Sequence, residues 1–464
     1  MAIGSVYTPD AWADWLVERC DAARAWAAGG TIGDPTGGDG ALLDAVIRVA
    51  ERRGFTPTDA NFARLVLIER DAEAVRAARF RFTGRPVTIY HRDVIRDNPG
   101  VQCDVLIGNP PWASFQNLPD VEKADLKPYF RANGLVGESR SLLLGASRVD
   151  LSALVVAIAV AGNLTDGGRA GFFLPAGLFF SDAAHAAFRA LPNLRLDELY
   201  AFTESTVFPV GTKYAAAMFR RSEPRQGSVP FHRERDGVWT DEFVRPCAGA
   251  GSPFEIVGDT DTLRVRLRIG QSPRQGLNTC GANDVYFFDV PPDVEPALVY
   301  PLLTKANFRG DGEPRRFVLL PHDPATGRPL SGDGLATTFP ATWRYLSRHR
   351  LRLSGRKGTL IQSHIRRGSW WALLGVGPYS FAPAKVVWEA YGRSHFRPQA
   401  VVGRWQPNQA LQAYIPCADP GEARQLADEL ARSGIEKRLL AQHAGGTCNW
   451  AQPGRIKRFL EFVL

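Results

Sequence analysis

The spacing of apolar and polar residues predicts alternating strands and helices in the first half of the chain. Short apolar runs with polar boundaries are typical of buried strands, whereas apolar residues three and four positions apart predict helices. The predicted strands are Leu65–Glu69, Val87–Tyr90, Cys103–Trp112 and Gly171–Pro175, with one more before the glycine-rich turn Thr31–Gly40. The predicted helices are Asp10–Trp26, Ala41–Arg53, Ala72–Phe80 and Arg148–Asn163. This order predicts an open α/β sheet.

The second half of the chain has a less regular pattern. Its apolar segments are short and are interrupted by Gly and Pro, which favours an irregular α/β domain over a second wound sheet. The segment Arg221–Gly237 is rich in Pro, Gly, Ser, Gln and charged residues and is interpreted as a linker. We therefore expect two domains, at residues 1–225 and 226–464, with a helix at Pro420–Leu440 near the end.

Four successive strands of the first half end in polar residues. The first three endings carry Asp34, Glu69 and Asp93, and the fourth is Asn109-Pro110-Pro111-Trp112. Open α/β sheets bind their ligands at the carboxyl ends of the strands, so we expect these residues at one edge. The glycine-rich turn lets the backbone approach a ligand closely. Asp34 and Asp39 make that turn anionic, which suits a cofactor with a positively charged amino acid better than a pyrophosphate.

The tip Asn109-Pro110-Pro111-Trp112 has the chemistry to hold an exocyclic amine of a nucleobase. Such an amine is a poor nucleophile and needs acceptors for its two N–H groups. The side-chain carbonyl of Asn109 and the main-chain carbonyl of Pro110 supply them, and the two prolines stiffen the backbone. Trp112 offers a flat ring on which an extruded base can stack. The alternative is a rigid Pro-Pro turn with a partly buried Trp.

Charge is distributed unevenly along the 464 residues. The net charge is +8, and residues 1–225 carry 25 Lys and Arg against 26 Asp and Glu, whereas residues 226–464 carry 31 against 22. The basic second half favours a polyanionic partner. An ordinary basic domain is the alternative.

Several protein classes are disfavoured by the sequence. The six cysteines and eight histidines show no spacing typical of disulfide frameworks or metal sites. The amino terminus lacks a secretory signal pattern, and the longest apolar run, Leu151–Gly162, is too short to span a bilayer. We therefore expect a cytoplasmic protein without a metal and without a membrane partner.

The order of these segments resembles a known enzyme family. Thr8-Pro9, the turn Asp34–Gly40, Glu69, Asp93 and Asn109–Trp112 follow one another as in the amino-group DNA methyltransferases that use S-adenosylmethionine. With the recognition domain last, the chain is similar to the TaqI-like, gamma-type N6-adenine enzymes. The resemblance implies a Rossmann-like class I methyltransferase domain followed by an irregular α/β target-recognition domain.

The resemblance also implies a cofactor site. Thr8 and Asp34 would flank the methionine part of S-adenosylmethionine, Glu69 would bind its ribose and Asp93 its adenine. The full set of implied cofactor-binding residues is Thr8, Asp34, Thr36, Gly38, Glu69, Arg70, Asp93, Val94 and Asn109. Where the family usually has Cys-Gly-Ser-Gly or similar, this chain has Gly37-Gly38-Asp39-Gly40, and Asp39 would add charge near the cofactor carboxylate. Read without the family, Thr8 and Pro9 are a common helix start, with Thr8 as the cap.

The implied catalytic residues are Asn109, Pro110, Pro111, Trp112 and Phe208. Phe208 lies in a segment similar to the one that places a second aromatic ring against the flipped base, as the partner of Trp112. The alternative for this segment is a hairpin edge in the core. No covalent nucleophile is implied.

The candidate DNA-binding residues are Lys213, Arg309, Arg366 and Arg367. Lys213 follows Phe208 and would face a phosphate. Two segments, Arg274–Asp284 and Pro301–Arg309, resemble parts of the TaqI-like specificity domain. The basic run Arg348–Lys357 and the pair Arg366-Arg367 before Trp370-Trp371 suit phosphate contact and base stacking.

The sequence thus predicts a site-specific methyltransferase that flips an adenine out of double-stranded DNA and methylates N6, in restriction–modification or phage defence. Three alternatives stay open. The acceptor could be an RNA base or a protein glutamine, since Asn-Pro-Pro-aromatic tips serve those enzymes too. N4-cytosine is another acceptor, although Ser usually leads that motif. The last is a non-catalytic DNA-binding subunit of a defence complex, acting with protein partners.

Overall fold

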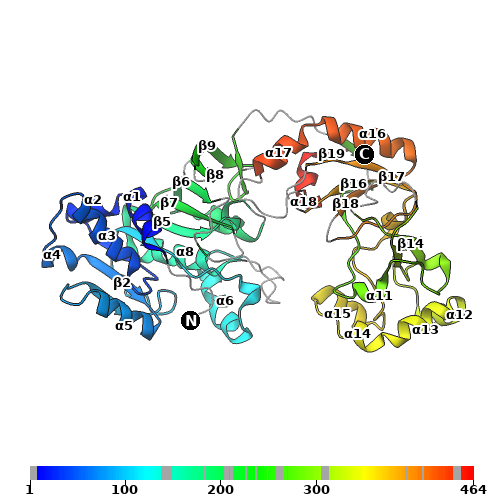
Figure 1. Ribbon diagram of the computed structural model, residues 1–464, viewed down its shortest axis with the longest axis horizontal. Helices are drawn as coiled ribbons and strands as arrows, with labels where there is room; N and C mark the ends of the chain where they lie inside the picture. The colour runs from blue at the N-terminus through cyan, green and yellow to red at the C-terminus, as the bar shows by residue number, and fades with distance from the viewer. Residues whose placement is uncertain are drawn as a thin grey trace. The chain divides into compact units, whose positions relative to one another are not determined.

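The chain forms two compact units. The computed structural model describes residues 8–136, 149–180, 183–202, 208, 213–224, 227–235, 238–247, 249–257, 265–268, 270–304, 313–391, 395–409, 412–442 and 451–463. The first unit comprises Met1–Gly258 with Ala441–Thr447, and the second comprises Asp259–Leu440 with Cys448–Leu464 (Figure 1).

Within the described residues the first unit is built on one ten-stranded sheet, in the order β10-β9-β8-β6-β7-β5-β4-β1-β2-β3. Its strands are β1 (Ile32–Asp34), β2 (Leu65–Glu69), β3 (Thr88–His91), β4 (Cys103–Gly108), β5 (Leu164–Pro175), β6 (Arg195–Phe202), β7 (Tyr214–Arg220), β8 (Val229–Arg235), β9 (Val238–Pro246) and β10 (Phe254–Ile256). Strands β3, β2, β1, β4 and β5 are parallel, and β7 is antiparallel to both β5 and β6.

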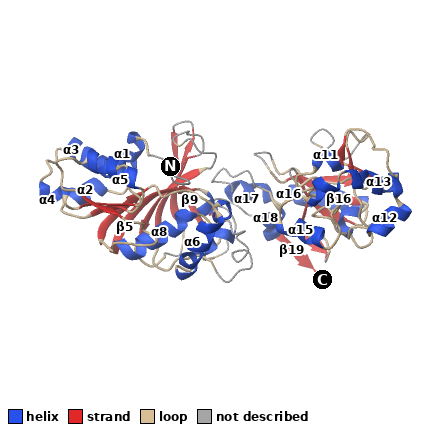
Figure 2. Cartoon of the chain, turned by 90° about the horizontal axis from the view of Figure 1, so that it is seen from below, coloured by secondary structure: helices blue, strands red, loops and turns tan. Residues whose placement is uncertain are grey.

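Helices cover both faces of the parallel part of the sheet, so strands such as β2 bury side chains on each side. In β2, Leu65 and Leu67 pack into the core beneath the first helices, whereas Val66 and Ile68 pack into the opposite core. Figure 2 shows α1 and α3 on one side of the sheet and α6 and α8 on the other. The helices of this unit are α1 (Asp10–Arg19), α2 (Ala22–Ala27), α3 (Ala41–Arg52), α4 (Asp59–Phe62), α5 (Ala72–Arg81), α6 (Asp120–Ala132), α8 (Leu151–Asn163), α9 (Gly177–Phe180) and α10 (Ala186–Arg189).

Two predicted helices are each divided in two. The predicted helix Asp10–Trp26 breaks at Asp21, which adopts φ 57° and ion-pairs with Arg24 and Arg169. The predicted helix Pro420–Leu440 breaks at Gly434, whose φ of 72° suits glycine. In both cases the apolar spacing continues across the break, so the pattern alone did not reveal it.

The predicted linker Arg221–Gly237 is wrong. Strand β8 lies within it and pairs in parallel with β6, and β9 and β10 extend the same sheet. The first unit therefore continues to Gly258, beyond the predicted boundary at 225. The polar composition of this segment suggested a linker because β8 lies toward one end of the sheet, where the neighbouring β9 leaves many side chains exposed.

The second unit contains small sheets and short helices. Its described strands form three sheets, β12-β18-β16-β17, β13-β15-β14 and β11-β19. The strands after Gly258 are β11 (Val265–Arg268), β12 (Arg274–Gln275), β13 (Phe287–Phe288), β14 (Val299–Pro301), β15 (Phe317–Leu319), β16 (Ala384–Glu389), β17 (Gln399–Val402), β18 (Gln412–Cys417) and β19 (Leu460–Val463). The helices are α11 (Asn283–Tyr286), α12 (Gly332–Thr338), α13 (Pro340–Arg348), α14 (Arg350–Ser354), α15 (Thr359–Arg366), α16 (Pro420–Arg432), α17 (Ile435–Gln442) and α18 (Pro453–Ile456).

The described residues contain neither a membrane-spanning helix nor a cluster of metal ligands. No helix among them combines the length and the apolarity that crossing a bilayer requires. No group of three or more His, Cys, Asp and Glu side chains among them is placed to hold a metal ion.

Candidate active site

The strand endings singled out in the sequence meet at one edge of the ten-stranded sheet. Strand β1 pairs in parallel with both β2 and β4, so Asp34, Glu69 and the tip after Gly108 lie at neighbouring carboxyl ends. Strand β7 runs the other way, and its first residue, Tyr214, pairs with Pro175 at the end of β5. The edge therefore also receives residues from the start of β7.

Asp34 is the most buried acid of this edge. Its side chain is 2% exposed, and one carboxylate oxygen accepts the backbone N–H of Thr36 at 3.1 Å. Burial raises the pKa of Asp34 to about 8; the Thr36 bond opposes this rise, and the nearby Glu69 adds to it. The acid therefore holds its proton near neutral pH unless a cation approaches it.

Thr36 supplies a second unusual group beside Asp34. Its hydroxyl oxygen is buried and has no hydrogen-bond partner among the described residues. A buried polar atom without a partner destabilises the fold, so such atoms are uncommon unless a ligand or a water satisfies them.

Glu69 fastens the glycine-rich turn to the end of β2. Its carboxylate accepts the backbone N–H of Gly38 at 2.9 Å and that of Asp71 at 2.7 Å. A methyl group added at Gly37 would lie 2.4 Å from Leu67, so this glycine is needed for the close approach of the turn to the strand. Each carboxylate oxygen has a second acceptor position, so Glu69 can bind hydroxyl groups as well.

Asp93 lies after β3 and is surrounded by donors. It accepts the backbone N–H of Ile95 at 2.8 Å, ion-pairs with Arg96, and lies 3.8 Å from the guanidinium of Arg70. Val94 beside it is buried. The two predicted cofactor residues Arg70 and Asp93 are thus brought together.

Asp39 does not add free charge to the turn. Its carboxylate pairs with Arg81 of α5 at 2.5 Å, and Arg81 also donates to the Asp39 carbonyl at 2.9 Å. Arg81 therefore balances the charge that Asp39 was expected to add near the cofactor carboxylate.

Thr8 does not cap α1. The cap position is Pro9, and the Thr8 hydroxyl instead accepts the side-chain N–H of Asn109 at 3.2 Å. This bond joins residues 101 positions apart and turns the amide nitrogen of Asn109 toward Thr8. The amide carbonyl, the acceptor that the predicted chemistry requires, therefore faces away from Thr8.

The rest of the tip is rigid and partly buried. Pro110 is buried and Pro111 is half-buried. The Trp112 indole N–H donates to the Phe173 carbonyl of β5 at 3.2 Å, and the ring stacks on Tyr214 with centroids 5.6 Å apart and an interplanar angle of 27°. Trp112 is thus held by a hydrogen bond and by one covered face.

Phe208 contacts Trp112, but the two rings are not parallel and do not form a slot for a base. Their ring centroids are 5.3 Å apart at an interplanar angle of 81°, and Phe208 is 2% exposed. A base cannot lie between rings in this arrangement. Tyr214, which the sequence analysis missed, covers the Trp112 face; its position becomes evident only from the antiparallel register of β7.

The candidate DNA-binding residues lie in different places. Lys213 precedes β7 at the same edge as Asn109, and its carbonyl accepts the backbone N–H of Ala176 at 2.9 Å. Arg366 and Arg367 are exposed at the end of α15 in the second unit, and Arg309 lies outside the described residues. The predicted stacking on Trp370 and Trp371 is wrong, because both rings are buried in the core of that unit.

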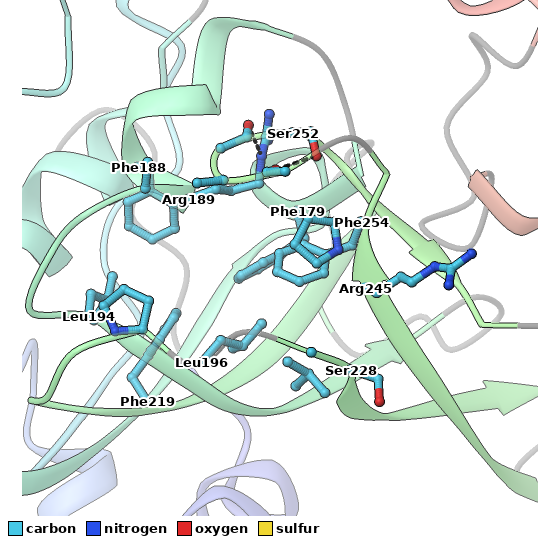
Figure 3. Close-up of a pocket in the computed structure, with 18 of the residues that line it drawn as sticks. Phe179, Phe188, Arg189, Leu194, Leu196, Phe219, Ser228, Arg245, Ser252 and Phe254 are labelled. Carbon is cyan, nitrogen blue, oxygen red and sulfur yellow. Dashed lines mark hydrogen bonds between the residues drawn. The ribbon is translucent and has the colours of Figure 1, made fainter. Parts of the chain in front are cut away.

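A separate cavity lies toward the other edge of the sheet. It has a volume of about 770 Å³, and its lining includes Leu196 at the start of β6 and Phe219 near the end of β7. Figure 3 shows phenylalanine rings around the hollow, with Arg245 pointing away from them. None of the predicted site residues lines this cavity.

Comparison with known proteins shows the fold. No family model matches the chain, and no curated protein matches it. The type IIL restriction–modification enzyme MmeI, solved in complex with DNA, matches with a TM-score of 0.54 and 13% identity over 88% of this chain and 59% of that chain.

Weaker matches include two further solved structures. A class I S-adenosylmethionine-dependent methyltransferase from Listeria monocytogenes has a TM-score of 0.38 and 18% identity over 49% of this chain and 65% of that chain. A type I restriction enzyme modification subunit from Vibrio vulnificus YJ016 has a TM-score of 0.35 and 17% identity over 51% of this chain and 48% of that chain. The chain spans about half to two thirds of these structures. The α/β fold with a large, mainly parallel sheet agrees with the predicted fold class.

Proposed function

We propose that the chain is an S-adenosylmethionine-dependent DNA methyltransferase that acts on N6 of an adenine flipped out of the duplex. The observation that carries this proposal is the meeting, at one sheet edge, of the buried Asp34 and the half-buried Glu69 with a rigid tip whose Asn109 amide is oriented by Thr8. Restriction–modification or phage defence is the proposed role, with partner proteins of such systems as further binding partners.

The residues present fit the proposed cofactor. Burial disfavours the ionised form of Asp34, and a cation beside it would make that form favourable again. The ammonium of a methionine moiety would supply that cation. The unpaired Thr36 hydroxyl would gain a hydrogen-bond partner, and Glu69 would accept from the ribose hydroxyls. Asp93 would accept from the adenine amine, beside Arg70 and the apolar Val94. When bound, S-adenosylmethionine supplies an electrophilic methyl group.

The tip would prepare the target amine. The Asn109 side-chain carbonyl and the Pro110 main-chain carbonyl accept its two N–H groups, so that the nitrogen lone pair points toward the cofactor. The prolines keep both acceptors in place, and fixed acceptors in a site that excludes water need little reorganisation during the reaction.

Trp112 would stack on the flipped base through the part of its ring that Tyr214 leaves uncovered. Stacking of this kind contributes roughly 1–3 kcal/mol per base. Phe208 and Tyr214 then hold the indole plane rather than touching the base themselves, which is the role their burial supports.

Duplex DNA is the proposed substrate for two reasons. The second half of the chain is strongly basic, with 31 Lys and Arg against 22 Asp and Glu. MmeI, whose fold matches most of this chain, is a restriction–modification enzyme solved in complex with DNA. We include Lys213, Arg309, Arg366 and Arg367 among the proposed phosphate contacts.

The experiment is a methyl-transfer assay with labelled S-adenosylmethionine and duplex DNA, RNA or protein as separate acceptors. Nucleoside analysis of the DNA should find N6-methyladenine. Asn109→Ala should abolish transfer and weaken the binding of S-adenosylmethionine much less, because Asn109 is only one of several proposed cofactor contacts but supplies an essential acceptor for the target amine. Label in RNA, in protein or in cytosine N4 would refute the assignment, as would cofactor binding without transfer to any acceptor.

A further inference from the structure

The tip Asn109–Trp112 has an anchor at each of its two ends. Upstream, Gly108 is the last residue of β4 and pairs with Phe172 of β5. A methyl group added at Gly108 would lie 2.9 Å from the Phe172 ring, so this approach needs a glycine. The sheet therefore fixes the upstream end. Downstream, the tip continues into Ala113, which belongs to no strand or helix.

The downstream end is fastened to the start of α8 by the backbone. The Leu151 N–H donates to the Ala113 carbonyl at 2.8 Å. The Phe115 N–H donates to the Val149 carbonyl at 2.8 Å. These two bonds engage the carbonyl of Ala113 but not its N–H, which is the backbone group directly after Trp112.

The Asp150 carboxylate supplies a partner for that N–H. It accepts the backbone N–H of Ala113 and, in the first turn of α8, the N–H of Ser152 at 3.0 Å and the Ser152 hydroxyl at 2.6 Å. Burial raises the pKa of Asp150, and these bonds oppose the rise. A helix cap does not require a carboxylate, because serine caps about as well. What the carboxylate adds is a second acceptor oxygen, which allows a bond to Ala113 as well as the cap.

We propose that Asp150 is a positioning residue, which fixes the downstream end of the tip through the N–H of Ala113. This inference rests on the proposed function, in which the tip carries the Pro110 carbonyl for the target amine and the Trp112 ring for the base. The two prolines stiffen the tip, so a shift at its downstream end moves these groups together. A misplacement of about 1 Å can lower a reaction rate about a hundredfold.

The variant Asp150→Ser separates the anchor from the cap. Its single oxygen stays on the Ser152 N–H and no longer accepts the Ala113 N–H. The single-turnover rate of methyl transfer to duplex DNA should fall at least about tenfold. The Kd for S-adenosylmethionine should change far less, because most of the proposed cofactor contacts lie outside the tip. Asp150→Asn keeps the length of the side chain and one acceptor oxygen, and its rate should fall less than that of Asp150→Ser.

The matched control is Asp419→Ser. Asp419 caps α16 by accepting the N–H groups of Gly421 and Glu422 at 2.7 and 2.9 Å, and α16 has 13 residues, as α8 has. The same substitution is thus made at the same place of a helix, in the unit that does not contain the tip. Its transfer rate should stay near that of the parent. Equal rates in the two serine variants would overturn the proposal, as would a Kd for S-adenosylmethionine that rises as much as the rate falls in Asp150→Ser.

Hydrogen exchange tests the anchor without methyl transfer. A peptide from Asn109 to Phe115 has few backbone amides, because its two prolines have none. This peptide should exchange faster in Asp150→Ser than in the parent, while peptides of α8 keep their protection. Unchanged exchange of the tip peptide, or loss of protection along α8 as well, would overturn the proposal. Faster exchange confined to the tip, with a parent protein that transfers no methyl group, would refute the proposed function and leave the anchoring by Asp150 standing.

Discussion

Replacing Asp34 by Asn tests whether the buried acid belongs to a ligand site. Asp34 is 2% exposed, and burial raises its pKa from 3.8 to about 8. Because the unfolded chain ionises this acid more easily than the folded chain does, Asp34 destabilises the ligand-free fold increasingly as pH rises from about 4 to about 8. Asn keeps an oxygen for the Thr36 N–H and cannot ionise.

The magnitude follows from the pKa. Each pH unit between the two pKa values costs about 1.4 kcal/mol, so the penalty approaches roughly 5 kcal/mol near pH 8. The difference in free energy of unfolding between Asp34→Asn and the parent should therefore grow by about 1.4 kcal/mol per pH unit between about pH 5 and about pH 7. The variant should also lose affinity for S-adenosylmethionine, because it lacks the partner of the ammonium.

The assay is urea unfolding followed by hydrogen exchange of peptides from β1 and α3, which reports the first unit separately. Asp71→Asn is the control, because the contribution of Asp71 to the free energy of unfolding should change with pH in the opposite direction. Asp71 accepts the N–H groups of Glu73 and Ala74 at the start of α5, and these bonds lower its pKa. A difference for Asp34→Asn that stays constant or shrinks as pH rises would refute the reasoning.

Three further predictions concern other contacts. Thr8→Val removes the acceptor of the Asn109 N–H and should lower kcat about tenfold, whereas Thr8→Ser should keep most of the activity. Single-turnover rates measure this difference. Equal rates for the two variants would argue against a role for the Thr8–Asn109 hydrogen bond. Tyr214→Leu should reduce the fluorescence response of 2-aminopurine at the target position, while Tyr214→Phe keeps the ring that covers Trp112; a response lost in both variants would instead point to the hydroxyl. Burial lowers the pKa of His322 to about 4, so the stability that its neutral ring provides is full above about pH 6.5 and is lost as pH falls toward 4. As pH falls from about 6.5 to about 4, the urea midpoint of the second unit should fall less in His322→Gln than in the parent. Equal falls in the two proteins would contradict the role of His322.

The residue pattern alone determined the local elements and their order. Strand β2 was predicted at its observed bounds, Leu65–Glu69, because an apolar run of that length between polar residues fits only a short buried strand. Parallel strands in succession also place Asp34, Glu69 and the Asn109 tip at one edge. These features depend on neighbouring residues and on chain direction, which a sequence contains.

Only the tertiary structure decided which distant groups pair. Asp39 could have faced a ligand, but Arg81, 42 residues away, takes its charge. Thr8 could have capped α1, but packing of the sheet brings Asn109 to its hydroxyl. Strand β8 joined the first sheet although it lies in a segment with the composition of a linker, and the aromatic rings of Phe208 and Tyr214 covered Trp112. Hydrogen bonds and ring contacts between residues far apart depend on geometry that local periodicity does not encode.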